Sequence, residues 1–124
     1  MSGNLKINIF YGMGMDCMER GEYAEAVKHF EKSMELQRRS ITAARLYECY
    51  VKLNRPKDAR ANIEMAFMLN TKSDPISTQY AAILMQEKNF KKATALLSNV
   101  LQRNPKYTPA QKLYDQLPIR TEGK

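Results

Sequence analysis

The side chains best able to do covalent or metal chemistry are few and widely spaced in this chain. It has one histidine, His29, and two cysteines, Cys17 and Cys49, which are far apart and lack the CxxC spacing of zinc or redox sites. No Gly-rich phosphate loop, Ser-centred nucleophile motif or paired Cys/His cluster accompanies them. The sequence therefore predicts that the chain is not an enzyme and holds no metal or cofactor. His29 is expected to be a surface or half-buried residue, and both cysteines to be reduced residues of the core.

A second set of side chains is suited to binding. Tyr11, Met15, Met18 and Met85 lie in stretches with helical spacing. An unbranched thioether repacks around varied shapes, which suits a surface that accepts an amphipathic helix or an extended apolar segment, and tyrosine adds an anchor with a polar tip. Met and Tyr at helical spacing are also typical of a core, so spacing alone leaves both interpretations open.

Basic side chains form a third set. Lys and Arg exceed Asp and Glu by 7, and residues 1–40 hold six acidic and six basic side chains, so the excess lies in residues 41–124. Such a field can steer an acidic partner or nucleic acid, or can serve solubility alone. The cations that gather at two predicted turns define a basic edge: Arg55, Lys57, Arg60, Lys88, Lys91 and Lys92.

The elements that must position these side chains are helices. The 124 residues fit one domain, and only five Gly and five Pro interrupt a composition rich in helix-forming residues. No apolar run reaches the roughly 18 residues of a membrane span, and no signal peptide is recognisable. We therefore expect an all-α, cytoplasmic protein without membrane insertion.

A repeat organises the chain. Segments 21–36, 54–69 and 88–103 align with offsets of 33 and then 34 residues. Small and large side chains alternate at four aligned positions, spaced so that they lie on one side of a helix, and each segment is predicted to be the second helix of a hairpin. The aligned sets are Ala26, Ala59 and Ala93; Phe30, Ile63 and Leu97; Ser33, Ala66 and Val100; and Met34, Phe67 and Leu101.

Turn residues mark the boundaries of these hairpins. Gly21, Asn54 and the pair Lys88-Asn89 fall between the two helices of each unit, where a residue able to take positive φ can end a helix. Helices are expected to begin at Asp74-Pro75 and Thr108-Pro109, with Asp74 and Thr108 as side-chain caps. The Asn104-Pro105 pair is expected to end the third hairpin.

Together these features resemble the tetratricopeptide repeat family, through a period near 34, an A-x-x-x-F-x-x-S/A pattern, the preceding G-E-Y and Gly14 in a first helix. One departure is Tyr47, which occupies the close-contact position of Gly14 and Ala81. The resemblance implies a right-handed superhelix of three hairpins plus a C-terminal capping helix. The expected segments are a tail at 1–6, repeats at 7–39, 40–73 and 74–107, a capping helix at 108–117 and a flexible tail at 118–124.

The resemblance also implies a concave surface lined by the first helices, and hence a protein-protein interaction module, a scaffold or small chaperone, that holds a segment of a partner polypeptide. The family's carboxylate clamp for acidic C-terminal peptides is absent, because Tyr11, Met15, Pro75 and Thr78 occupy positions where cations and amides would be needed. The predicted groove consists of Asn8, Tyr11, Met15, Met18, Glu19, Ala44, Glu48, Val51, Lys52, Thr78, Ala82 and Met85.

Two alternatives remain open. The N-terminal face around Phe10 has no preceding helix in the array, and open ends of such arrays attract copies of themselves, so the chain could form a homo-oligomer. RNA-reading helical repeats have a similar period, and the chain is basic. The predicted groove, however, has few cations to track phosphates and no repeated base-reading pairs, which disfavours nucleic acid.

Overall fold

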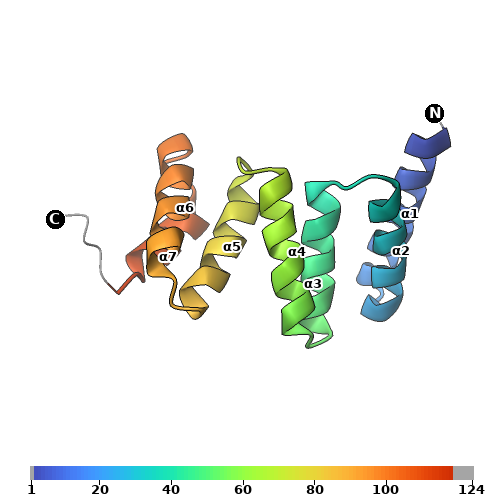
Figure 1. The fold of residues 1–124 in the computed structure, drawn as a ribbon, viewed down its shortest axis with the longest axis horizontal. Coiled ribbons are helices and arrows are strands. Elements are labelled where there is room, and N and C mark those ends of the chain that lie inside the picture. The colour runs from blue at the N-terminus through green and yellow to red at the C-terminus, as the bar shows by residue number, and fades with distance from the viewer. Residues whose placement is uncertain (1, 119–124) are drawn as a thin grey trace. The chain divides into compact units, whose positions relative to one another are not determined.

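The computed structural model describes residues 2–118, and this part of the chain consists of seven α-helices with no strand (Figure 1). The prediction of an all-α protein is confirmed. The chain divides into two compact units, Met1–Asn70 and Thr71–Lys124. None of the helices described is long and apolar enough to cross a membrane. Most of the tail predicted at 118–124 lies outside the described residues.

The first unit contains two pairs of helices. Helices α1 (Ser2–Glu19) and α2 (Tyr23–Leu36) pack together, as do α3 (Ser40–Lys52) and α4 (Pro56–Leu69), and α2 also packs on α3. Helix α1 begins at Ser2, so residues 2–6 belong to it and do not form the predicted tail. Adding a residue to an existing helix costs far less than nucleating one, and no proline stands in this stretch to stop it.

The turn inside each pair has the same hydrogen-bonded geometry. Gly21, Asn54 and Lys88 all have positive φ, of 77°, 59° and 65°. In each turn the N–H of that residue donates to the carbonyl three residues earlier, and the next N–H donates to the carbonyl five residues before it. These are the two bonds of the Schellman motif, which satisfies carbonyls at the end of a helix. The predicted positive φ is confirmed, and in the third turn it falls on Lys88 and not on Asn89.

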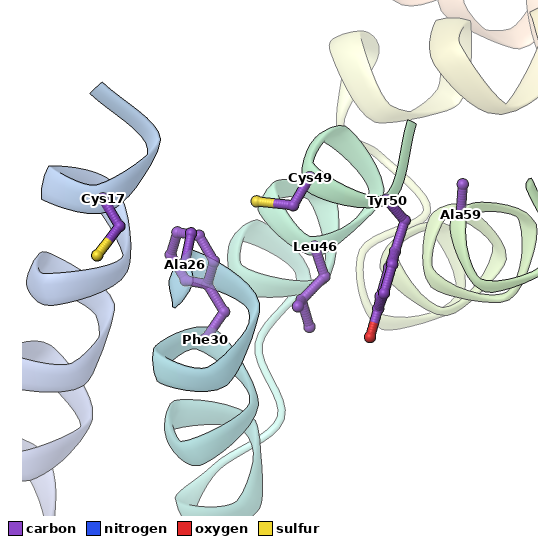
Figure 2. Close-up of a cluster of buried hydrophobic side chains, with 7 residues drawn as sticks. All are labelled: Cys17, Ala26, Phe30, Leu46, Cys49, Tyr50 and Ala59. Carbon is purple, nitrogen blue, oxygen red and sulfur yellow. The ribbon is translucent and has the colours of Figure 1, made fainter. Parts of the chain in front are cut away.

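Buried residues of all four helices form the core of the first unit (Figure 2). Phe30 of α2 is fully buried, and a Cβ placed on Gly14 of α1 would lie 2.6 Å from its Cε1 atom. Glycine is required there because the two helices approach so closely. Ser33 is also fully buried, and its hydroxyl donates a 3.1 Å hydrogen bond to the carbonyl of Ile7, so this polar group is satisfied inside the pair.

The two cysteines lie in this core, as predicted. Cys17 of α1 and Cys49 of α3 are buried free thiols. Burial raises the pKa of the Cys49 thiol to about 11, because the thiolate would have to exist without water, and the nearby charge of Glu48 adds to the shift.

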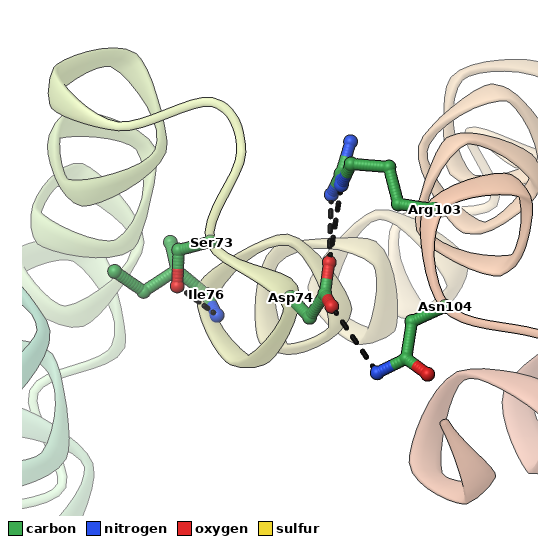
Figure 3. Close-up of polar contacts among 5 residues, drawn as sticks. All are labelled: Ser73, Asp74, Ile76, Arg103 and Asn104. Atoms are coloured by element: carbon green, nitrogen blue, oxygen red, sulfur yellow. Dashed lines mark hydrogen bonds and ion pairs between the residues drawn. The ribbon is translucent and has the colours of Figure 1, made fainter. Parts of the chain in front are cut away.

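The second unit begins with α5 (Asp74–Gln86) and α6 (Phe90–Arg103), which pack together. The helix starts where Asp74-Pro75 predicted, but the cap is Ser73, whose hydroxyl accepts from the N–H of Ile76 at 3.3 Å. Asp74 instead accepts from Arg103 at the end of α6, at 2.8 and 3.3 Å, and from Asn104 (Figure 3). Its carboxylate thus joins the start of α5 to the end of α6.

Helix α7 (Thr108–Asp115) packs on α6 and α5. It begins at Thr108 as predicted, but the residue before it, Tyr107, is the cap, and no side chain bonds there. Ala110 and Leu117 are buried, whereas Gln111, Lys112 and Asp115 are not. The segment therefore has an apolar inner side and a polar outer side.

Candidate functional site

The first helices of the first unit meet at Tyr11. The Tyr11 ring packs at a tilt against the ring of Phe30, with centroids 5.6 Å apart. Two arginines also reach it, Arg39 just before α3 and Arg45 on α3. The guanidinium of Arg39 lies over the ring, 5.4 Å from the centroid, and Nε of Arg45 donates to the tyrosine hydroxyl at 3.3 Å. Tyr11 therefore connects the buried core to the surface shared by α1 and α3.

Arg45 is held in place from both sides. Besides the bond to Tyr11, its Nη1 donates to Oε2 of Glu48 at 2.8 Å, one turn along α3. Burial alone would lower the pKa of this guanidinium, but the hydrogen bond with Tyr11 and the Glu48 carboxylate outweigh it and raise that pKa overall. The arginine stays charged, and its charge is largely matched inside the protein. The sequence pattern did not reveal the bond between Arg45 and Tyr11, since these two residues lie on different helices.

The predicted groove residues differ widely in exposure. In the first unit Asn8, Glu19, Val51 and Lys52 are exposed, and Val51 has 52% of its surface free. Tyr11, Met15 and Met18 are half-buried and pack against the core. Ala44 is buried, so it offers little surface to a partner.

The second unit contributes three predicted groove residues, all on α5. Thr78 is 7% exposed and thus buried, while Ala82 and Met85 are half-buried. Val51 and Lys52 on α3, with Asn8 and Glu19 on α1, are the predicted groove positions with the most free surface.

The six residues of the basic edge are divided between the units. In the first, Arg55 pairs with Asp58 at 2.6 Å and lies 5.0 Å from the centre of the Tyr50 ring, and Arg60 pairs with Glu64 at 3.0 Å. Lys57 is exposed.

In the second unit, Lys92 donates to the hydroxyl of Tyr80 at 3.3 Å and lies over its ring. Lys88 occupies the positive-φ position of the turn, and Lys91 is exposed in the first turn of α6. Several of these cations thus have contacts within the chain.

Within residues 2–118, no three His, Cys, Asp or Glu side chains gather where they could hold a metal ion. His29 is half-buried on α2, as the sequence predicted.

Comparison with known families and proteins gives a match in one segment. Residues 7–40 match the family described as tetratricopeptide repeat. These residues comprise most of α1, the turn at Gly21 and α2. No curated protein matches the chain.

Solved structures similar to the chain cover most of it. The second TPR domain of human RPAP3, solved in complex with an HSP70 peptide, has a TM-score of 0.79 at 13% identity and covers 94% of this chain and 98% of its own. The first TPR of Spaghetti (RPAP3), bound to an HSP90 peptide, has a TM-score of 0.78 at 18% identity, with 91% and 90% covered.

A third similar structure is YrrB, a TPR protein described as having an unusual peptide-binding site. It has a TM-score of 0.71 at 25% identity, covering 84% of this chain and 54% of its own. The resemblance predicted from the sequence is therefore confirmed: residues 7–40 match the tetratricopeptide repeat, and the chain shares the fold of tetratricopeptide domains over most of its length.

Proposed function

We propose that the chain is a protein-protein interaction module that holds a segment of another polypeptide against its first helices. The observation that carries this proposal is the surface around Tyr11, where Met15 and Met18 of α1 are half-buried against the core and Val51 of α3 is exposed. Thioethers and a tyrosine on a preformed helical scaffold suit an apolar or amphipathic segment. Two similar structures contain a bound peptide, which supports a role of this kind.

The proposal includes an architecture. Three hairpins, at 7–39, 40–73 and 74–107, would stack as a right-handed superhelix, with the segment 108–117 as a capping helix and the first helices lining one concave groove. The recurrence of one Schellman turn at Gly21, Asn54 and Lys88 supports three equivalent hairpins.

The chemistry of the surface favours an apolar segment over an acidic tail. The positions where the family's clamp for acidic C-terminal peptides places cations and amides are Tyr11, Met15, Pro75 and Thr78 here. Of the two arginines at Tyr11, Arg45 is already paired with Glu48, and the guanidinium of Arg39 lies over the Tyr11 ring. A peptide carboxylate would therefore have to compete with an internal partner, whereas an apolar side chain would not.

Peptides selected from a displayed library against the 124-residue chain test this proposal. The selected peptides should be rich in apolar residues, and their binding should change little with salt, because screening weakens exposed charge pairs but not apolar contacts. Met15→Glu and Val51→Glu should each weaken binding more than about tenfold, since a carboxylate would lose its water in the contact.

Val51 is exposed, so its replacement separates binding from folding. Met68→Glu is the matched control: Met68 is 69% exposed on α4 and is not a predicted groove residue. Equal binding by Val51→Glu, Met68→Glu and the unchanged chain would rule out the groove as the binding surface.

Nucleic acid is the weaker candidate. Arg55, Arg60 and Lys92 already have contacts with Asp58, Glu64 and Tyr80. An RNA interaction would be distinguished by a steep loss of affinity between low and physiological salt, because each phosphate contact releases a counterion.

A further inference from the structure

The outward side of α1 carries an apolar stripe that none of the described residues covers. Leu5, Ile9 and Met13 follow at four-residue spacing and so lie on one side of the helix. They are 60%, 48% and 40% exposed. Phe10 and Leu36 line, with Ile9, a recess of about 320 Å³ whose other lining residues are charged, namely Lys6, Lys32 and Glu35. Contiguous apolar surface of this kind marks an interaction site on a protein in water. We call Leu5, Ile9 and Met13 the α1 stripe.

The next helix pair indicates what covers such a stripe. With the offset of 33 residues, Ile9 and Met13 of α1 correspond to Thr42 and Leu46 of α3. Those two are 0% and 2% exposed, and α3 packs against α2. The same positions on α1 carry apolar side chains and remain open. The repeat therefore provides a face built to receive a helix.

Gly12 gives a second, independent indication. A glycine inside a helix is less favourable than alanine, because it loses more backbone freedom on folding. Gly14 has a reason within the chain, because its Cβ would collide with Phe30, but a Cβ on Gly12 would meet no atom within 4 Å. Gly12 adjoins Ile9 and Met13 on the helix surface, so its missing side chain leaves room for another backbone beside the stripe.

The charges around the stripe fit a second copy of the same helix. Lys6 lies near one end and Asp16 near the other, and both are exposed. An antiparallel copy would bring each Lys6 beside the Asp16 of its partner, with Ile9 facing Met13. Residues 1–40 hold six acidic and six basic side chains, so two such ends meet without a net charge to oppose them.

We infer that the α1 stripe is an isologous interface through which two copies of the chain pair with their α1 helices antiparallel. In an interface of this type each contact occurs twice, once in each half, so one substitution acts at two places. The pairing uses the outward side of α1 and is separate from the proposed groove.

Sedimentation equilibrium of the 124-residue chain over a wide range of concentrations tests the pairing. The chain should show a monomer-dimer equilibrium, and Ile9→Lys should raise the dissociation constant more than about tenfold, because two lysines would enter an apolar contact. Ile9 is half-exposed, so circular dichroism should show an unchanged fold. The control Met68→Lys places the same charge at an exposed apolar site on α4 and should leave association unchanged. A chain that stays monomeric, or one whose association responds equally to both variants, overturns the proposal.

Charge exchange tests the antiparallel arrangement. Lys6→Glu and Asp16→Lys alone should each weaken pairing about threefold to tenfold, since exposed attractions become repulsions at two symmetric places. A mixture of the two variants should pair again, because the carboxylate introduced in one chain then meets the ammonium group introduced in the other. Failure of the mixture to associate overturns the arrangement. A monomer that binds a foreign amphipathic helix through Ile9 also overturns it.

Discussion

Two glycines on the same helix should respond in opposite ways to alanine. Gly12 and Gly14 lie two residues apart on α1, so alanine brings both positions the same gain in helix propensity, about 1 kcal/mol. They differ in what the added Cβ would touch. At Gly12 there is open space, whereas at Gly14 the Cβ would lie 2.6, 2.7 and 2.8 Å from three ring atoms of Phe30.

The magnitude follows from these distances. Carbon atoms in contact normally lie about 3.5 to 4 Å apart, so the ring or the helix would have to move by roughly 1 Å. Phe30 has no exposed surface, and the Tyr11 ring lies against it, so it has little room to shift. Overpacking of this kind costs about 1 to 3 kcal/mol. Gly12→Ala should therefore stabilise the chain by about 0.5 to 1 kcal/mol. Gly14→Ala should be less stable than Gly12→Ala by about 1 to 3 kcal/mol.

Urea unfolding followed by far-ultraviolet circular dichroism measures this difference, at low protein concentration so that association does not contribute. Hydrogen exchange of the α2 amides would assign the change to the first unit. In a Phe30→Leu background the penalty at Gly14 should shrink, because leucine lacks the ring atoms that the Cβ meets. Equal stability of the two alanine variants would refute the close approach of α1 and α2 at Phe30.

Three further predictions concern other parts of the chain. Ala59→Leu should destabilise the second helix pair by about 1 to 3 kcal/mol, because Ala59 is 4% exposed in the core, and an unchanged melting temperature would contradict that packing. Asp74→Ala and Arg103→Gln should each cost up to about 1 kcal/mol, since the pair is partly exposed. The double variant should then cost little more than either alone, and full additivity in urea unfolding would show that the two residues do not interact. The Cys49 thiol keeps its proton to a pKa of about 11 in the fold against its usual 9.0, so the folded state binds more protons between these values. The free energy of unfolding should therefore fall as pH rises above about 9, and Cys49→Ala should flatten this fall.

Local requirements made much of the fold predictable from the sequence. A turn with positive φ needs a residue that tolerates it, and the aligned positions Gly21, Asn54 and Lys88 adopt that conformation. The alternation of small and large residues predicted which side of each second helix faces inward, and three of the four aligned positions in each of these helices are buried. Both signals depend on near neighbours in sequence, and a period of 33 to 34 residues repeats each of them three times.

Contacts between distant residues were not predictable in the same way. Asp74 was expected to cap α5, but its carboxylate binds Arg103, 29 residues away, and Ser73 takes the capping role. The charged hydrogen bond to arginine is the stronger of the two interactions available to Asp74. Nothing in the local pattern places Arg103 nearby.

The candidate site shows a related limit. Which residues of a helix face a groove depends on how the helix is rotated about its own axis, and consecutive residues point in directions about 100° apart. Ala44 and Thr78 of the predicted stripes are buried, whereas Val51 and Lys52 are exposed. The contacts of Tyr11 with Arg39 and Arg45 were also not predictable from the sequence, because they depend on how α1 and α3 are placed relative to each other in the fold.

The double role of Tyr11 has a consequence for how a binding surface on this scaffold can vary. Its ring supports Phe30 in the core while its hydroxyl and face hold two arginines, so a change at Tyr11 alters packing and surface charge together. Met15 and Met18 are tied to the core in the same way. Val51 and Lys52 do not pack against the core in this way, since both are exposed. Preference among partners can therefore change at these exposed positions with little effect on stability, while the half-buried ones hold the shape of the surface constant.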